Sequence, residues 1–404
     1  MKPRRDRPSQ IAKIFVSLPT GGCSCTIVPS RRMPQEMFSP RRSADERDEV
    51  AGGGDNGRTA GGRGMAPWLA GLGAVAGAGA ALGGYALLYE PFDVRAEQLT
   101  VRLMRDRRGL PDEGLRILHI SDTHFRGADH RERAKIEQVR RATADAQFDL
   151  LIHTGDFLHN DGGLENVLAL IDSIPRPRIG SFAVTGNHDH VVYEMRKALH
   201  YSWRIYRARG GKRRDGATGE RVLTRRARLG SLLHFARYLL NNRFDGEPSG
   251  VNDIAGLRRA LEGRGVQFLD NQAVRLEGTD AYLVGIEDLL QGEPDLQGGL
   301  QDVRPDAPTI LLSHNPDIIA APAAGQADLI LAGHTHGGQI VLPLLGPVYT
   351  QTEHLTRSEA SGHWRQGKTH VYVHRGLGES IPIRLGSPPH VTFLTLLPAR
   401  PAGA

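Results

Sequence analysis

One segment of the chain reads Leu329-Ile330-Leu331-Ala332-Gly333-His334-Thr335-His336-Gly337-Gly338. A short apolar run bounded by turn residues is typical of a buried strand. The two histidines that follow it have no packing role. Alternate residues of an extended segment point the same way, so both imidazoles would reach the same side. The segment therefore predicts a strand that ends in a pair of metal-ligating histidines.

Four other apolar runs end in the same kind of turn. The runs at 115–120, 148–153, 179–184 and 309–312 are followed by Ser121-Asp122-Thr123-His124, Thr154-Gly155-Asp156, Gly186-Asn187-His188-Asp189 and Ser313-His314-Asn315. Helical patterns alternate with some of these strands, which predicts an α/β fold with layered sheets. Because ligands in such folds bind beyond the carboxyl ends of strands, we expect the five motifs to meet in one crevice.

The residue types match a site for two divalent metal ions. One ion could take an Asp and two His, the other could take His and an amide oxygen, and a carboxylate could bridge them. Ligands of this kind without sulfur suit Mn, which we favour, or Fe, Zn or Mg. Two metals roughly 3.5–4 Å apart activate water at neutral pH, neutralise phosphate oxygens and align the attacking and leaving oxygens. His188, beside Asn187, is the candidate general acid.

Each motif alone also has an ordinary interpretation. An isolated Asp-x-His pair is usually a solvated loop, Gly-Asp after a strand is a common turn, and a single His314 would be a hydrogen-bonded buried histidine. The ordered set of five, each at a strand end, favours the metal site over five separate explanations.

This ordered set resembles the calcineurin-like metallophosphoesterase superfamily. The superfamily pattern is Asp-x-His, Gly-Asp, Gly-Asn-His-Asp/Glu, His and Gly-His-x-His, and the resemblance covers roughly residues 113–398. It implies a two-sheet β-sandwich flanked by helices, in four αββα layers, with His188 in the acid role and Asp156 shared by both metals. The implied ligands are Asp122, His124, Asp156 and His336 for the first metal and Asp156, Asn187, His314 and His334 for the second.

A narrower resemblance is to bacterial membrane-associated phosphodiesterases of this superfamily, which include UDP-2,3-diacylglucosamine pyrophosphatases of lipid A synthesis. It is carried by Tyr89-Glu90-Pro91, Gly333–Gln339 and the stretch from Arg375 to Gly386. It implies hydrolysis of a phosphodiester or pyrophosphate bond in a lipid-linked substrate at the bacterial inner membrane, on a side left open. The alternatives are a phosphodiesterase acting on nucleotides or nucleic acid, and a metal-binding scaffold without turnover.

The N-terminal part of the chain differs in composition from the rest. Residues 1–64 are rich in Arg, Pro, Ser and Gly, which predicts a disordered basic tail, and Met65 is a candidate true start. Residues 66–89 carry no charge. We therefore expect 65–90 to be a membrane anchor or an export signal, with a buried soluble helix as the alternative. Cys23 and Cys25 are the only cysteines, so the core has no disulfide and no thiolate ligand.

An insertion at 191–249 departs from the compact superfamily pattern. Its residues 191–245 hold 14 Arg or Lys against 4 Asp or Glu, a net charge of +10 in a chain whose total is +6. Seven aromatic residues are interleaved with these charges. Such a segment suits contact with an anionic membrane surface, as do residues 66–89. The alternatives are a solvated helical hairpin packed on the domain and, less favoured, nucleic-acid binding.

Overall fold

The computed structural model describes residues 66–127, 129–193 and 248–400. The predicted tail 1–64 and all but the ends of the insertion 191–249 lie outside the described residues, so both interpretations stay predictions. The chain divides into two units, and the fold described below is that of the unit that contains the residues from Ala81 onward.

The first sheet has a parallel centre that bears three of the five motifs. In order across the sheet, its strands are β1 (Arg95–Arg102), β16 (His390–Leu397), β2 (Leu115–Ile120), β3 (Leu150–Thr154), β4 (Gly180–Val184) and β7 (Val266–Phe268). Strands β2, β3, β4 and β7 run parallel, and β16 lies antiparallel to β2. The apolar runs of β2 and β3 are buried on both faces, as expected of central parallel strands.

The second sheet bears the other two motifs. In order, its strands are β14 (Gly362–Gln366), β15 (Thr369–Val373), β11 (Leu329–Ala332), β10 (Thr309–Leu312), β9 (Tyr282–Gly285) and β8 (Gln272–Arg275). Strands β9, β10, β11 and β15 run parallel, and the two edge strands are antiparallel to their neighbours.

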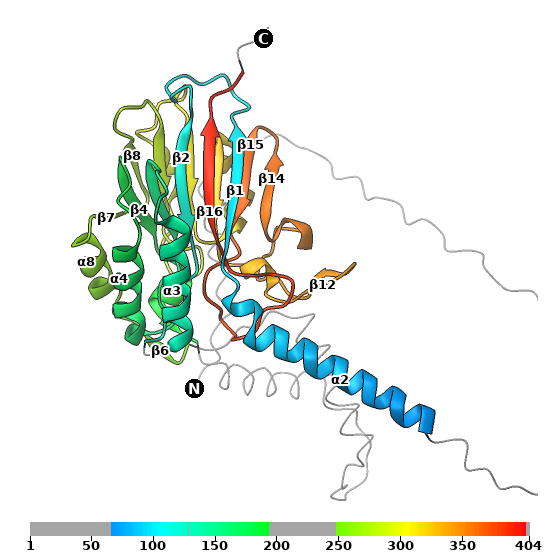
Figure 1. The fold of residues 1–404 in the computed structure, drawn as a ribbon. Helices are drawn as coiled ribbons and strands as arrows, with labels where there is room; N and C mark the ends of the chain where they lie inside the picture. Colours follow the sequence, from blue (N-terminus) through cyan, green and yellow to red (C-terminus); the bar gives the residue numbers. More distant parts are fainter. Residues whose placement is uncertain (1–65, 128, 194–247, 401–404) are drawn as a thin grey trace, which may run out of the picture. The chain divides into compact units, whose positions relative to one another are not determined.

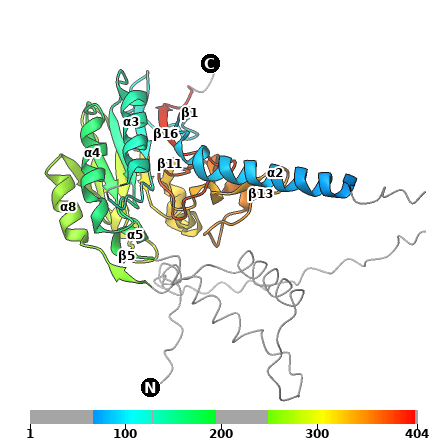
Figure 2. The same cartoon turned by 60° about the horizontal axis from the view of Figure 1, so that its bottom comes forward.

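The two sheets pack face to face, and helical segments cover their outer faces. Side chains such as Ile117, Ile152, Leu312 and Leu331 form the core between the sheets. The outer face of the first sheet packs on α3 (His130–Thr143), α4 (Leu164–Ser173) and α8 (Ile254–Glu262), which Figures 1 and 2 show side by side. The outer face of the second sheet packs on α9 (Leu296–Leu300), η3 (Pro316–Ala320) and η4 (Pro322–Gln326). The expected four-layer sandwich is confirmed.

Local sequence explains where the covering helices begin. The Asp129 carboxylate accepts a hydrogen bond of 2.9 Å from the backbone N–H of Arg131 at the start of α3, and Asp253 caps α8 in the same way. In α3, Lys135, Val139 and Thr143 are buried at intervals of four residues, so one stripe of the helix faces the sheet.

Helix α2 spans Ala66–Leu88, inside the predicted anchor or signal. None of the helices in the described ranges is both long enough and apolar enough to cross a bilayer. The remaining elements are η1 (Glu90–Phe92), η2 (Asp161–Gly163), α5 (Asn187–His190), β5 (Val191–Val192), β6 (Gly250–Val251), η5 (His336–Gly338), β12 (Val341–Leu342), β13 (Gly346–Pro347) and η6 (Arg357–Glu359). The antiparallel pair β5–β6 joins the two ends of the insertion.

Candidate metal centre

The seven residues expected to bind metal are all buried, and six of them gather in two groups. Their exposure does not exceed 5%. They follow β2, β3 and β4 in the first sheet and β10 and β11 in the second, so the carboxyl ends of both parallel sets meet. We call this set the ligand cluster: Asp122, His124, Asp156, Asn187, His314, His334 and His336.

The first group joins Asp122, His124 and His336, and their ligand atoms all lie within 4.8 Å of one another. The Nε2 atoms of His124 and His336 are 2.9 Å apart, and His336 Nε2 is 3.6 Å from Asp122 Oδ1. Nitrogen ligands stand about 2.0–2.1 Å from a metal such as zinc, so two on one cation lie within about 4.2 Å of each other. The first group has the spacing that one cation requires.

The second group joins Asp156, His314 and His334 on the same criterion. His334 Nδ1 is 3.2 Å from His314 Nε2. The carboxylate of Asp156 also reaches the first group, because its Oδ2 lies 3.2 Å from His314 Nε2 and 3.3 Å from His124 Nε2. A carboxylate oxygen between two sets of imidazoles is in the position of a bridging ligand.

The backbone of the cluster is strained. Asp122, His124, Asp156, His334 and His336 all have φ between 46° and 71°, in the left-handed region. Each non-glycine residue held there costs on the order of 1–3 kcal/mol, and such strain collects at functional sites. The turns at Asp122–His124 and His334–His336 therefore place the side chains by a left-handed backbone and not by simple strand alternation.

Two glycines leave room for these turns. A side chain at Gly186 would collide with the carboxylate of Asp156, and one at Gly333 would collide with Asp122 and Ser121. Glycine is therefore required at these two positions, because the neighbouring ligand atoms lie too close to leave room for a side chain.

Several buried ligand atoms have no hydrogen-bond partner among the described residues, including Asp122 Oδ2 and Asn187 Oδ1. A buried polar atom left unpaired costs free energy unless something else binds it. Burial holds the pKa of His124 well below its usual range and that of His334 at about 3, so these imidazoles are neutral and able to donate to a metal. The donor set and the unpaired atoms fit two divalent cations.

Asp189 organises the cluster without belonging to it. Its carboxylate accepts hydrogen bonds from the backbone N–H groups of Asp156 (2.9 Å), Gly186 (2.9 Å) and Leu158 (3.0 Å). It thereby holds the turn after β3 against the turn after β4. Supports of this kind orient metal ligands and tune their affinity.

The structure adds residues that the sequence motifs do not include. His159 forms a third group with His124 and His188, and the His159 and His188 rings stack at 5.7 Å between centroids. Arg126 donates from Nη2 to the Ser380 carbonyl oxygen at 3.0 Å, and Ser380 Oγ lies 3.3 Å from His336 Nε2. His159 follows Asp156 by three residues and Arg126 follows His124 by two. Their closeness in the sequence to these motifs is the signal that could have identified them.

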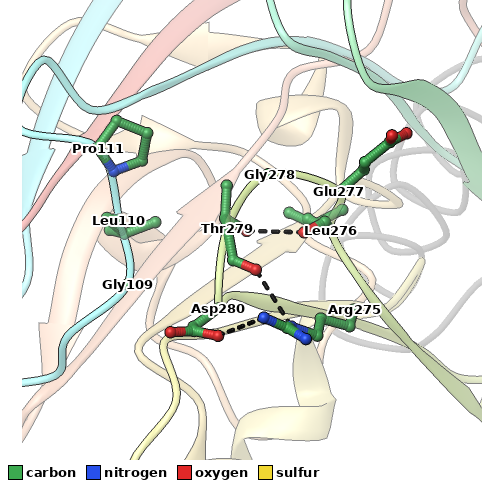
Figure 3. A pocket seen from close by; sticks show the side chains of 9 residues that line it. All are labelled: Gly109, Leu110, Pro111, Arg275, Leu276, Glu277, Gly278, Thr279 and Asp280. Carbon is green, nitrogen blue, oxygen red and sulfur yellow. Dashed lines mark hydrogen bonds and ion pairs between the residues drawn. The ribbon is translucent and has the colours of Figure 1, made fainter.

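A hollow lined by residues 109–111 and 275–280 lies away from this chemistry (Figure 3). It lies beside the turn that joins β8 to β9 and before the start of β2, whereas the ligand cluster follows the ends of the strands. Two of its three charged residues, Arg275 and Asp280, pair with each other. The hollow therefore has no part in the metal centre.

Comparison with known proteins agrees with this geometry. The model of the calcineurin-like phosphoesterase family matches residues 115–338, which include the whole ligand cluster. UDP-2,3-diacylglucosamine pyrophosphatase LpxG of Chlamydia muridarum is 31% identical over 295 residues, 70% of this chain and 84% of its own. The uncharacterized metallophosphoesterase YkuE of Bacillus subtilis is 26% identical, over 78% of this chain and 89% of its own.

Proposed function

Because this chain belongs to the calcineurin-like phosphoesterase family and is a metal-dependent phosphoesterase, we propose that it cleaves a phosphodiester or diphosphate bond in a lipid-linked substrate. A substrate of the UDP-2,3-diacylglucosamine type is the one that we favour. Seven residues would hold two divalent metals, and His188 would serve as the general acid.

The observation that carries the proposal is the position of Asp156. One of its oxygens stands about equally far from an imidazole of each group, at 3.2 and 3.3 Å. Its other oxygen accepts a hydrogen bond of 2.8 Å from the backbone N–H of His188. Asp156 is therefore fixed between the two groups and is able to serve both metals.

Two bound cations would supply Lewis-acid activation of water and neutralise the phosphate charge. The chain's own residues would hold the substrate around them. His159 stacks on the His188 ring, and Arg126 donates to the carbonyl of Ser380, whose hydroxyl lies beside His336. A guanidinium and an imidazole beside the cluster suit the anionic oxygens of a second phosphoryl group.

We assign His188 the role of assisting the leaving group. Its ring makes an edge contact with the His124 ring, at 4.6 Å between centroids, and its Nδ1 has no hydrogen-bond partner among the described residues. Burial lowers the pKa of His188, and the charge of Asp156 opposes that shift. A phosphate anion beside the ring would act in the same direction as Asp156 and raise the pKa of His188, so the substrate itself favours the protonated form that donates to the leaving oxygen.

Two observations favour a lipid-linked substrate and association with a membrane. A relative that shares 31% identity over most of both chains carries the name UDP-2,3-diacylglucosamine pyrophosphatase. The segment 66–89 precedes the domain and carries no charge, which suits an apolar environment.

The test is hydrolysis by the full chain, supplied with Mn²⁺, Mg²⁺, Zn²⁺ or Fe²⁺ singly. The substrates are UDP-2,3-diacylglucosamine, bis(p-nitrophenyl) phosphate and a cyclic nucleotide. We expect the lipid diphosphate to be the best substrate by kcat/KM. Preference for the cyclic nucleotide would support the nucleotide phosphodiesterase instead, and no hydrolysis with any metal would refute the proposal.

A further inference from the structure

The short hairpin β12–β13 has two solvent-exposed leucines at its tip. Leu344 is 106% exposed and Leu345 is 70% exposed, between Pro343 and Gly346. Figure 1 draws this hairpin at the lower end of the sheets, the end at which β2 finishes and the ligand cluster lies. Single exposed apolar residues are common, but two adjacent leucines at a projecting turn leave a large apolar area in water.

The backbone at this tip is also strained. Leu344 has φ 66°, a conformation that costs an ordinary L-residue on the order of 1–2 kcal/mol and that glycine adopts freely. The turn therefore presents a leucine where glycine or asparagine would be easier to accommodate. Strain combined with exposure of an apolar side chain points to a role outside the fold's own stability.

Two neighbouring segments extend the apolar surface. Ile381 is 42% exposed, and Leu88 and Tyr89 at the end of α2 are 76% and 60% exposed. Backbone hydrogen bonds link the three segments in order. The N–H of Arg384 donates to the Ala86 carbonyl, and the N–H of Val341 donates to the Leu385 carbonyl. We call Leu344, Leu345, Ile381, Leu88 and Tyr89 the apolar rim.

The apolar rim is tied to a metal ligand. The Glu90 carboxylate, one residue beyond Tyr89, accepts hydrogen bonds from the backbone N–H of Gly386 (2.9 Å) and Ser387 (2.6 Å). Ser387 Oγ in turn donates to the His336 carbonyl at 2.9 Å. The hairpin also begins only a few residues after His336. A surface that bound the apolar rim would therefore lie next to the metal centre.

Two arginines stand beside the apolar rim. Arg131 donates from Nη2 to the Leu87 carbonyl at 3.2 Å, and Arg126 donates to the carbonyl of Ser380, the residue before Ile381. Arginine next to exposed apolar side chains complements an anionic, partly apolar surface such as the headgroup region of a bilayer.

We propose that the apolar rim is a membrane-docking surface whose hairpin tip inserts into the interface of an anionic bilayer, so that the metal centre faces lipid-borne substrate. The inference rests on the proposed function for the choice of a lipid-linked substrate. It adds the surface through which the protein would bind the bilayer that contains this substrate. A bilayer is favoured over a second copy of the chain because the rim includes the last residues of the uncharged segment 66–89 and is bordered by arginines.

The test compares the full metal-loaded chain with the double variant Leu344→Ser/Leu345→Ser. Sedimentation with vesicles of phosphatidylglycerol and phosphatidylcholine measures partition, and bis(p-nitrophenyl) phosphate reports the intact site. Removing two leucines from the interface should lower partition at least about tenfold. Turnover of the soluble diester should not change. Met104→Ser, which alters an exposed apolar residue after the far end of β1, should match the wild type in both assays.

A second variant tests directly whether the hairpin tip enters the bilayer. Leu345→Trp should gain a blue-shifted emission component when vesicles are added, measured against the wild-type signal. Unchanged partition of the double variant, or no shift with Leu345→Trp, would overturn the docking proposal. If the wild type formed a dimer in solution and the double variant did not, the rim would serve self-association. That result would also overturn the docking proposal. Failure of the proposed function is separate, because docking could persist with no lipid diphosphate cleaved.

Discussion

Two groups of buried histidines lie in the same sandwich, and their surroundings differ. The ligand cluster stands at the strand ends, where Asp122 and Asp156 face its imidazoles. The second group, which we call the histidine stack, consists of His119 on β2, His374 after β15 and His390 on β16. In the stack, His374 and His390 lie parallel at 3.8 Å between centroids, and His119 meets His374 edge-on at 4.9 Å.

Burial alone does not distinguish the two groups, because both are almost fully enclosed. In the stack, burial holds the pKa of His119 at about 3 and those of His374 and His390 well below the usual range. In the ligand cluster, burial also opposes the charged form of His314, but the carboxylates of Asp156, Asp122 and Asp288 together outweigh it and raise the pKa to about 10. The ligand cluster therefore differs from the stack in its converging aspartates and its left-handed backbone, and not in the burial of its imidazoles.

Asp156→Ala is the change with the largest expected effect. It removes the carboxylate between the two groups, and several kcal/mol of charge stabilisation should be lost with it. We expect turnover to fall about a thousandfold or more, measured as kcat/KM on a diester. If Asp156→Ala kept wild-type turnover, the ligand cluster would have no more claim to a catalytic role than the histidine stack.

His188→Gln should impair protonation of the leaving group and leave metal binding unchanged. We expect about a hundredfold loss on alkyl esters, whose leaving oxygen needs a proton, and a much smaller loss on p-nitrophenyl esters. Metal content by mass spectrometry should match that of the wild type. Equal losses on both ester types would contradict the acid role.

Asp189→Asn tests the support behind the cluster. An amide has one acceptor oxygen where the carboxylate has two, so Asp156, Gly186 and Leu158 would not all keep their hydrogen bonds. Metal affinity should fall about 10- to 100-fold, measured by titration with competing chelators. Asp172→Asn, on the exposed end of α4, is the matched control and should leave the affinity unchanged.

His390→Leu should have the smallest effect on activity. It breaks the 3.0 Å contact with the Tyr372 hydroxyl, which keeps its bond to Thr392. We expect unfolding free energy to fall by about 1–2 kcal/mol in urea titration, with turnover and metal content unchanged. Loss of metal on this substitution would show that the stack belongs to the metal centre.

Much of the sandwich was predictable because its central strands are apolar runs that end in chemically distinct turns. The bounds of β2 and β10 agree with the sequence prediction, and six of the seven predicted ligands gather in two groups. The five apolar runs that carry the motifs did not include β7, β8 or β14. β7 has three residues, and β8 and β14 are polar edge strands that lack a periodic apolar signal.

Other features depend on tertiary contact that sequence spacing does not encode. His119 lies inside an apolar strand, so nothing local relates it to His374 and His390. The apolar rim combines residues from α2, the β12–β13 hairpin and the loop before Arg384, and each of them looks ordinary alone. The left-handed φ values of the ligands are likewise set by the packing of the turns against each other.

The most direct test of the central claim is the number of metal ions bound per chain, measured by mass spectrometry on the purified full chain and on Asp156→Ala. A site built around a shared carboxylate predicts two ions in the wild type and a loss at both positions in the variant. One ion in the wild type, or two ions retained by Asp156→Ala, would contradict the bridging role and with it the proposed dinuclear centre.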